Sequence, residues 1–159
     1  LREWIVTGDF DPGSEATLFN HPKGNFSVLI CFEDIFPDLV RRFAKGSDFL
    51  VNITNDAWFG RSGAPFQHAQ ASVFRAVENR RSVLRAANTG YSCLIDPTGR
   101  ILRELRLGEE RLFVTGQRTW EVPLSRKETF YTRHSSLFLG LCLLLSAAGI
   151  FTSSFSFRK

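Results

Sequence analysis

Short apolar runs alternate with amphipathic segments along most of the chain. Residues 26–31 and 49–53 are short and mostly apolar, which is typical of buried strands. Residues 37–45 lie between these runs and predict a helix that begins at Pro37 and ends before Gly46, a favoured C-terminal capping residue. The apolar face of this helix is expected to consist of Leu39, Val40, Phe43 and Ala44.

A second, longer helix is predicted from Pro65 onward. Its apolar stripe at helical spacing comprises Phe66, Ala69, Val73, Phe74 and Val77. The other face carries Gln67, Arg75 and Glu78, which indicate a solvated or salt-bridged surface. His68 falls on this polar side, so we expect it at the surface rather than acting as a general base.

The following residues have the pattern of a sheet. Strands are predicted over 83–87, 91–95, 101–105 and 112–115, with turns at 88–90 and 96–99. Strand and helix therefore alternate first, and a run of strands follows. This order predicts an α/β layered domain.

The C-terminal segment has a different character. Residues 135–155 carry no charge, and Arg158 and Lys159 follow. A membrane-spanning helix needs about 20 mostly apolar residues, so a span over 135–156 is predicted; the alternative is a buried core helix. We expect a domain over 1–120, a tether over 121–134 and a short tail over 157–159. Basic residues flank both ends of the span, so they do not decide its orientation.

Composition excludes several classes of protein. Without Arg158 and Lys159 the basic side chains number 18 against 16 acidic ones, so no nucleic-acid partner is indicated. The three cysteines and three histidines are scattered, which predicts neither a disulfide framework nor a metal site, and no cofactor is expected. The chain contains no Met and opens at Leu1, so we expect it to be a fragment.

Cys31 is the strongest candidate for chemistry. It follows a predicted strand and precedes a predicted helix, and a helix N-terminus stabilises a thiolate nucleophile. The alternative is a buried cysteine that acts as a small hydrophobe. Glu33 either orients this site or simply favours the start of the helix.

A polar and aromatic loop follows the second strand. Asn55, Asp56, Trp58 and Phe59 are expected at the same sheet edge as Cys31, where ligands of open α/β sheets bind. Ordinary turn chemistry for the polar pair and core packing for the aromatic pair are the alternatives.

Five motifs together resemble a known family. In order and spacing they are similar to the C-terminal half of the apolipoprotein N-acyltransferases, membrane members of the nitrilase or carbon-nitrogen hydrolase superfamily. The motifs are Ile30-Cys31-Phe32-Glu33, Asn55-Asp56-Ala57-Trp58-Phe59-Gly60, Gln67-His68, Arg75-Ala76-Val77-Glu78-Asn79-Arg80 and Asn88-Thr89-Gly90.

The resemblance implies a fold and a set of site residues. It implies the C-terminal half of a nitrilase-type αββα sandwich followed by one transmembrane helix. Of a Glu-Lys-Cys triad this chain would hold only the nucleophile Cys31, with the glutamate and the lysine upstream, and Glu33 would support the site. Phe32, Trp58 and Phe59 would bind substrate, although many relatives carry Tyr in place of Phe32.

The implied activity is acyl transfer in lipoprotein maturation. A fatty acyl chain would move from a phospholipid, through a Cys31 thioester, to the N-terminal amine of diacylglyceryl-cysteine in an apolipoprotein. The domain would lie in the periplasm, anchored in the bacterial inner membrane, and the fragment alone would be inactive. Two alternatives remain: a membrane-tethered hydrolase of the amidase or nitrilase type, and a degenerate chain that only binds lipid or a partner.

Overall fold

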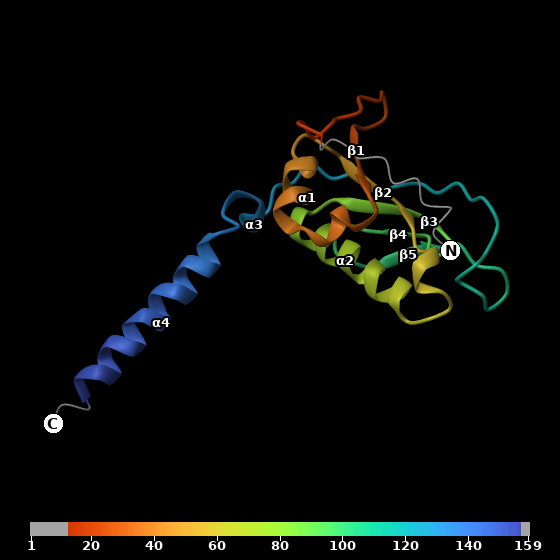
Figure 1. Ribbon diagram of the computed structural model, residues 1–159. Helices are drawn as coiled ribbons and strands as arrows, with labels where there is room; N and C mark the ends of the chain where they lie inside the picture. Colours follow the sequence, from red (N-terminus) through yellow and green to blue (C-terminus); the bar gives the residue numbers. More distant parts are fainter. Residues whose placement is uncertain (1–12, 157–159) are drawn as a thin grey trace.

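Five strands form one mixed sheet in the computed structural model, which describes residues 13–156 (Figure 1). The strands follow one another in sequence order across the sheet. The first three pair in parallel and the last two antiparallel. They are β1 (Phe26–Ile30), β2 (Phe49–Asn55), β3 (Ser82–Asn88), β4 (Cys93–Ile95) and β5 (Ile101–Glu104).

Helical crossovers connect the parallel strands. The short helix η1 (Cys31–Ile35) and α1 (Pro37–Ala44) join β1 to β2. The turn η2 (Ala57–Phe59) and α2 (Ala64–Asn79) join β2 to β3. The connections from β1 to β2 and from β2 to β3 step in the same direction across the sheet, and connections between parallel strands are right-handed. The helices α1 and α2 therefore cover the same face of the sheet (Figure 1).

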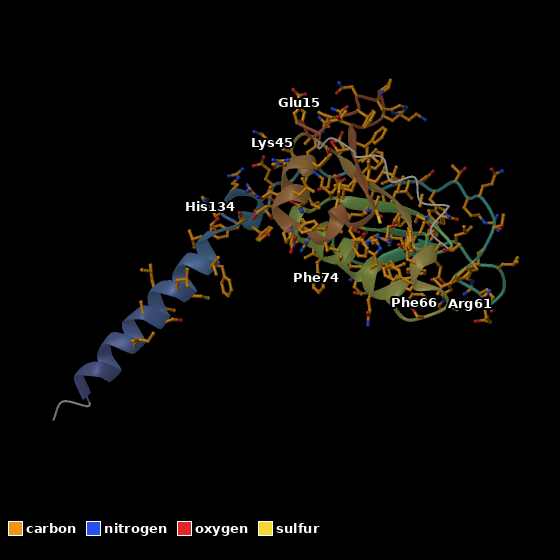
Figure 2. All side chains as sticks on the ribbon, viewed as in Figure 1. Glu15, Lys45, Arg61, Phe66, Phe74 and His134 are labelled. Atoms are coloured by element: carbon orange, nitrogen blue, oxygen red, sulfur yellow. The ribbon has the colours of Figure 1, made fainter. Side chains whose placement is uncertain are left out.

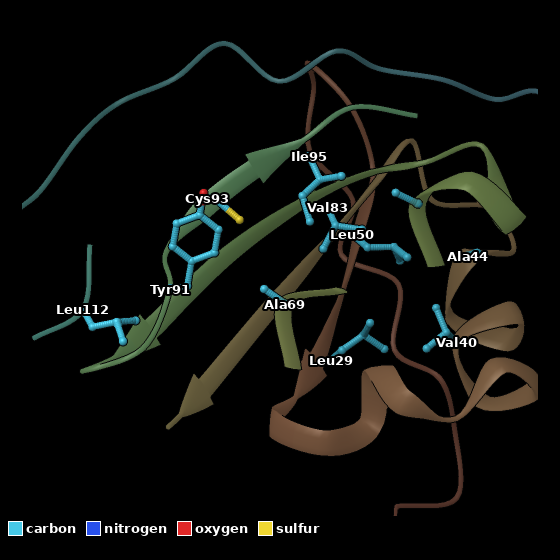
Figure 3. Close-up of a cluster of buried hydrophobic side chains, with 11 residues drawn as sticks. Leu29, Val40, Ala44, Leu50, Ala69, Val83, Tyr91, Cys93, Ile95 and Leu112 are labelled. Atoms are coloured by element: carbon cyan, nitrogen blue, oxygen red, sulfur yellow. The ribbon is translucent and has the colours of Figure 1, made fainter. Parts of the chain in front are cut away.

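The hydrophobic core lies between this face and the two helices. Leu29, Leu50 and Val83 from the strands are completely buried. They belong to one cluster with Val40 of α1 and Ala69 of α2, among others (Figure 3). On the opposite face Ile30 and Ile53 remain 60% and 45% exposed. The buried-exposed alternation of the strands therefore leaves this second face partly open.

One predicted strand is wrong. Residues 112–115 belong to no strand, although the other predicted strands and both predicted helices are present. Phe113 has a φ of 57°, and its N–H donates to the Thr89 carbonyl oxygen at 2.9 Å. An extended strand cannot continue through a residue in the left-handed region, which explains the difference.

The predicted apolar face of α2 is also wrong in part. Phe74 is 61% exposed and points away from the domain (Figure 2), whereas His68, Ser72 and Arg75 are buried. The expected surface position of His68 is therefore incorrect, since this residue is only 5% exposed. Polar partners on η1, after β2 and on β3, described below, account for the burial of His68 and Ser72, and Arg75 is paired with Glu78.

The C-terminal part returns along the domain before it leaves it. The Ser125 N–H donates to the Asp48 carbonyl oxygen, and the guanidinium of Arg81 donates to the Lys127 carbonyl oxygen. Beyond α3 (Phe130–Arg133), the helix α4 (Leu137–Ser156) projects away from the sheet domain (Figure 1).

No helix in the described part of the chain is long and apolar enough to cross a membrane, so the predicted span is not confirmed. The predicted start of the domain and the tail over 157–159 lie outside the described residues.

Candidate active site

Cys31 occupies a sharp turn at the carboxyl end of β1. It is the first residue of η1, is half-buried, and has a φ of 52°. For a residue with a side chain this left-handed conformation costs about 1–2 kcal/mol, so surrounding contacts must hold it. The turn places the thiol at the sheet edge, as the sequence predicted.

Glu33 supports this turn through the backbone. Its Oε2 accepts a hydrogen bond from the N–H of Ile30 at 2.7 Å. The Glu33 carboxylate thus holds the backbone of Ile30, the residue immediately before Cys31. In the structure Glu33 shapes the strand-to-helix junction.

A cavity of ≈ 770 Å³ opens beside Cys31. Its walls are mainly apolar and come from the open sheet face and from the returning segment after β5. These apolar lining residues include Ile30, Ile53, Leu84, Leu105, Val114 and Trp120. Among the described residues, the lining includes no carboxylate and no lysine.

Trp58 shares this cavity with Cys31, whereas Phe32 and Phe59 do not line it. The indole of Trp58 is 76% exposed. Phe32 stacks instead on the imidazole of His68, with ring centroids 4.6 Å apart, and meets Phe59 edge-on at 5.9 Å. The structure therefore brings one of the three predicted substrate-binding aromatics to the candidate nucleophile.

A buried charge network lies beneath these rings. His68 bridges two carboxylates: Nε2 lies 3.0 Å from Asp34 Oδ1, and Nδ1 lies 2.9 Å from Asp56 Oδ1. The Arg85 guanidinium contacts the same carboxylates, at 2.8 Å from Asp34 and 3.3 Å from Asp56. All four side chains are almost completely withdrawn from solvent.

The surroundings favour the protonated form of His68. Burial opposes its positive charge, but the hydrogen bonds to Asp34 and Asp56 outweigh burial and raise its pKa to about 9. Burial likewise opposes ionisation of Asp56, yet hydrogen bonds from His68 and Thr54 lower its pKa. With two cations and two carboxylates the network is neutral. Since both ring nitrogens then carry protons, the 3.2 Å contact from Arg85 Nη2 to His68 Nδ1 is not a hydrogen bond.

Sequence reasoning did not find this network. The sequence pattern does not distinguish Asp34 or Arg85, it fits Asp56 to a turn or to a site, and it predicts His68 at the surface. A signal was present, because Arg85 lies in the middle of β3 with two apolar residues on either side of it. An arginine is almost never fully buried unless it is paired, so such a position predicts carboxylate partners.

Comparison with known proteins identifies the family of this chain. The sequence profile described as carbon-nitrogen hydrolase matches residues 7–118. The chain belongs to the carbon-nitrogen hydrolase family. Its fold is accordingly the nitrilase-type α/β fold with a mixed sheet.

Similar proteins fall into two groups. The apolipoprotein N-acyltransferase of Geobacter metallireducens is 44% identical over 153 residues, and the match covers 96% of this chain and 28% of that protein. The apolipoprotein N-acyltransferase of Thermotoga maritima is 39% identical over 91% of this chain and 28% of its own length. The chain thus spans little more than a quarter of these relatives.

An amidase represents the second group. A solved structure of a mutant amidase from Nesterenkonia sp. AN1 has the acetamide moiety of fluoroacetamide covalently added at its active-site cysteine. It is 25% identical to this chain, and the match covers 60% of this chain and 39% of the amidase with a TM-score of 0.50. The predicted resemblance to the acyltransferase family and its superfamily is confirmed by these matches and by the family profile.

Proposed function

We propose that this chain carries the nucleophile of an apolipoprotein N-acyltransferase. Cys31 would take a fatty acyl chain from a phospholipid and pass it to the N-terminal amine of diacylglyceryl-cysteine in an apolipoprotein. The observation that carries the proposal is the position of the Cys31 thiol, on a strained turn beside a large, mainly apolar cavity. The names of the relatives support the choice of substrates.

The first half-reaction forms a thioester. The Cys31 thiolate attacks the ester carbonyl of the phospholipid, and the carbon–oxygen bond to glycerol breaks. The departing alkoxide takes a proton and leaves as a lysophospholipid. A thiolate suits this step because it is strongly nucleophilic near neutral pH.

The second half-reaction forms the amide. The free amine of the acceptor attacks the thioester carbonyl, the carbon–sulfur bond breaks, and the thiolate is regenerated. The amine must lose a proton, and the tetrahedral oxyanion needs hydrogen-bond donors. Within the described residues the cavity walls supply neither a carboxylate nor a lysine. The resemblance assigns these groups to a glutamate and a lysine upstream, so we expect this chain alone to be inactive.

The cavity offers a place for the acyl chain. Its apolar walls would bury methylene groups, each worth about 0.8 kcal/mol. Trp58 stands among these lining residues and is largely exposed, which suits a residue that contacts a lipid tail. Phe32 and Phe59, which pack beside His68, stay predictions as substrate contacts.

Membrane attachment belongs to the same proposal. Phe138, Leu139 and Leu144, which point to different sides of α4, are 76%, 62% and 71% exposed, and residues 135–155 carry no charge. A helix with apolar side chains on every side is typical of a lipid environment. We propose that this segment anchors the protein in the bacterial inner membrane with the catalytic domain in the periplasm. Both proposed substrates are lipids, so an anchor would raise their effective concentration at Cys31.

A hydrolase of the amidase type is the second candidate. It is favoured by the solved amidase, whose active-site cysteine forms a covalent adduct on the same fold. In that case water instead of an amine would release the acyl group. The two candidates differ in product, because only the acyltransferase makes a triacylated peptide.

The test uses the full-length protein with a radiolabelled phospholipid. Without an acceptor, we expect label on the protein that hydroxylamine releases, as a thioester requires. Adding a diacylated lipopeptide should then yield triacylated product. Cys31→Ala should abolish both signals, whereas Cys142→Ala on α4 should keep them. Labelling that persists in Cys31→Ala would refute the proposal, and free fatty acid without triacylated product would favour the hydrolase.

A further inference from the structure

The carbonyl group of the candidate nucleophile is held by a buried side chain. Asn52 Nδ2 donates to the backbone oxygen of Cys31 at 3.0 Å. This bond fixes the peptide group that follows Cys31, while Glu33 fixes the N–H of the residue before it. Together the two contacts hold the left-handed backbone at Cys31, and the direction of its side chain depends on that backbone.

The amide of Asn52 is itself oriented by Arg85. Asn52 lies opposite Arg85 in the β2–β3 register and is completely buried. Its Oδ1 accepts from Arg85 Nη1 at 3.1 Å. Since Arg85 has only donors, the amide oxygen must face it, and the amide nitrogen must face the Cys31 carbonyl.

Two carboxylates hold the guanidinium of Arg85 in place beside Asn52. Besides Asn52, its guanidinium binds Asp34 at 2.8 Å and Asp56 at 3.3 Å. Asp34 lies on η1, three residues after Cys31, so the same guanidinium also holds the helix that the nucleophile begins. Ser72 of α2 donates to Asp34 and accepts from Arg85 at 2.9 Å, which ties the helix layer to this network.

Packing alone does not require these polar groups. Leu29 and Val83, from β1 and β3, fill the same layer beside Asn52 and Arg85 with apolar side chains. A buried ion network is often no more stabilising than apolar residues of similar volume, so its presence here calls for another reason.

We propose that Asn52 and Arg85 are positioning residues that hold the backbone of Cys31, and thereby its thiol, in the reactive orientation. The inference rests on the proposed nucleophilic role of Cys31. In this account Asn52 and the Arg85 guanidinium act through the backbone of Cys31 and not on the substrate, although Arg85 is among the residues that line the cavity. The Arg85 guanidinium orients the side-chain amide of Asn52, and this amide holds the backbone carbonyl of Cys31.

The test compares two isosteric substitutions in the full-length protein. Asn52→Asp replaces the donor with a carboxylate oxygen that cannot donate to the Cys31 carbonyl when ionised. Asn79→Asp is the matched control, because Asn79 is equally buried and its Nδ2 also donates to a backbone carbonyl at 3.0 Å, that of Arg75 within α2. Asn52→Ala removes the amide without adding a charge.

Two rates are measured for each variant after the folded fraction has been determined. The first is alkylation of the Cys31 thiol by iodoacetamide without lipid. The second is acyl transfer, separated into kcat and KM for the phospholipid. Loss of one positioning hydrogen bond is expected to lower the alkylation rate and kcat about tenfold in both Asn52 variants. KM should stay within about twofold, and Asn79→Asp should change neither rate by more than about twofold.

Several outcomes would overturn the proposal. The proposal is wrong if the Asn52 variants fold and both their rate of Cys31 alkylation and their kcat equal those of the unchanged protein. Unfolding of both Asn52 variants while Asn79→Asp folds would show that Asn52 serves the fold instead. If the full-length protein transfers no acyl chain, the proposed function fails, but the alkylation rates still decide whether Asn52 positions the thiol.

Discussion

Gly90 packs directly against the carboxylate of Asp56: a Cβ built at position 90 would lie 2.2 Å from Asp56 Oδ2. Gly90→Ala should therefore displace a member of the buried charge network. We expect destabilisation of about 2–4 kcal/mol, because neither the backbone nor the paired carboxylate can move freely. Gly63→Ala is the control, since no heavy atom lies within 4 Å of its added Cβ. Thermal unfolding of the full-length protein measures both, and equal midpoints would contradict the prediction.

His68 should make stability depend on alkaline pH. Its pKa rises from 6.5 to about 9 on folding, so its contribution is complete below pH 6.5 and disappears as the pH rises through about 9. The shift corresponds to roughly 3 kcal/mol at most. His68→Gln should lower stability at neutral pH and flatten the decline between pH 7 and 10. His134→Gln, at an exposed histidine, should preserve that decline. An unchanged alkaline profile in His68→Gln would show that the network does not need the imidazolium.

Glu33 should contribute to the stability of the turn that carries Cys31. Glu33→Ala removes the acceptor for the Ile30 N–H and is expected to cost about 1 kcal/mol. Glu33→Gln keeps an acceptor oxygen and should cost less. Denaturant unfolding of the two variants gives the comparison. If alanine and glutamine prove equally costly, the charge of Glu33 rather than its hydrogen bond matters.

The three thiols should differ in reactivity. Cys93 is completely buried, and burial raises its pKa to about 12, so it should resist alkylation in the folded protein. Cys31 and Cys142 are half-buried and should react. Mass spectrometry after brief treatment with iodoacetamide identifies the modified peptides. Modification of Cys93 before unfolding would show that the core opens far more readily than its packing indicates.

Local sequence was sufficient for most elements and for the position of Cys31. The helix α1 was predictable because Pro37 favours its start and Gly46 follows its end. Cys31 was predictable because a strand-to-helix junction is a local feature, and the order of strands and helices is enough to place it at the sheet edge.

The charge network was not predictable in the same way. His68 is separated from Asp34 by 34 positions, and Arg85 from Asp34 by 51. On helix periodicity alone His68 belongs to the polar side and therefore to solvent. Its burial is favourable only because strand ends and η1 bring two carboxylates to it in space, and no local pattern contains that information.

By itself the sequence determined the strand-helix order, the thiol at the end of β1 and the family to which the chain belongs, because hydrophobic periodicity and short motifs are properties of neighbouring residues. Only the tertiary structure decided that Trp58 shares a cavity with Cys31, and that Asn52 and Arg85 connect its carbonyl to buried charges. Such contacts depend on how distant strands align, since a charged side chain can be buried only where folding brings its partners together.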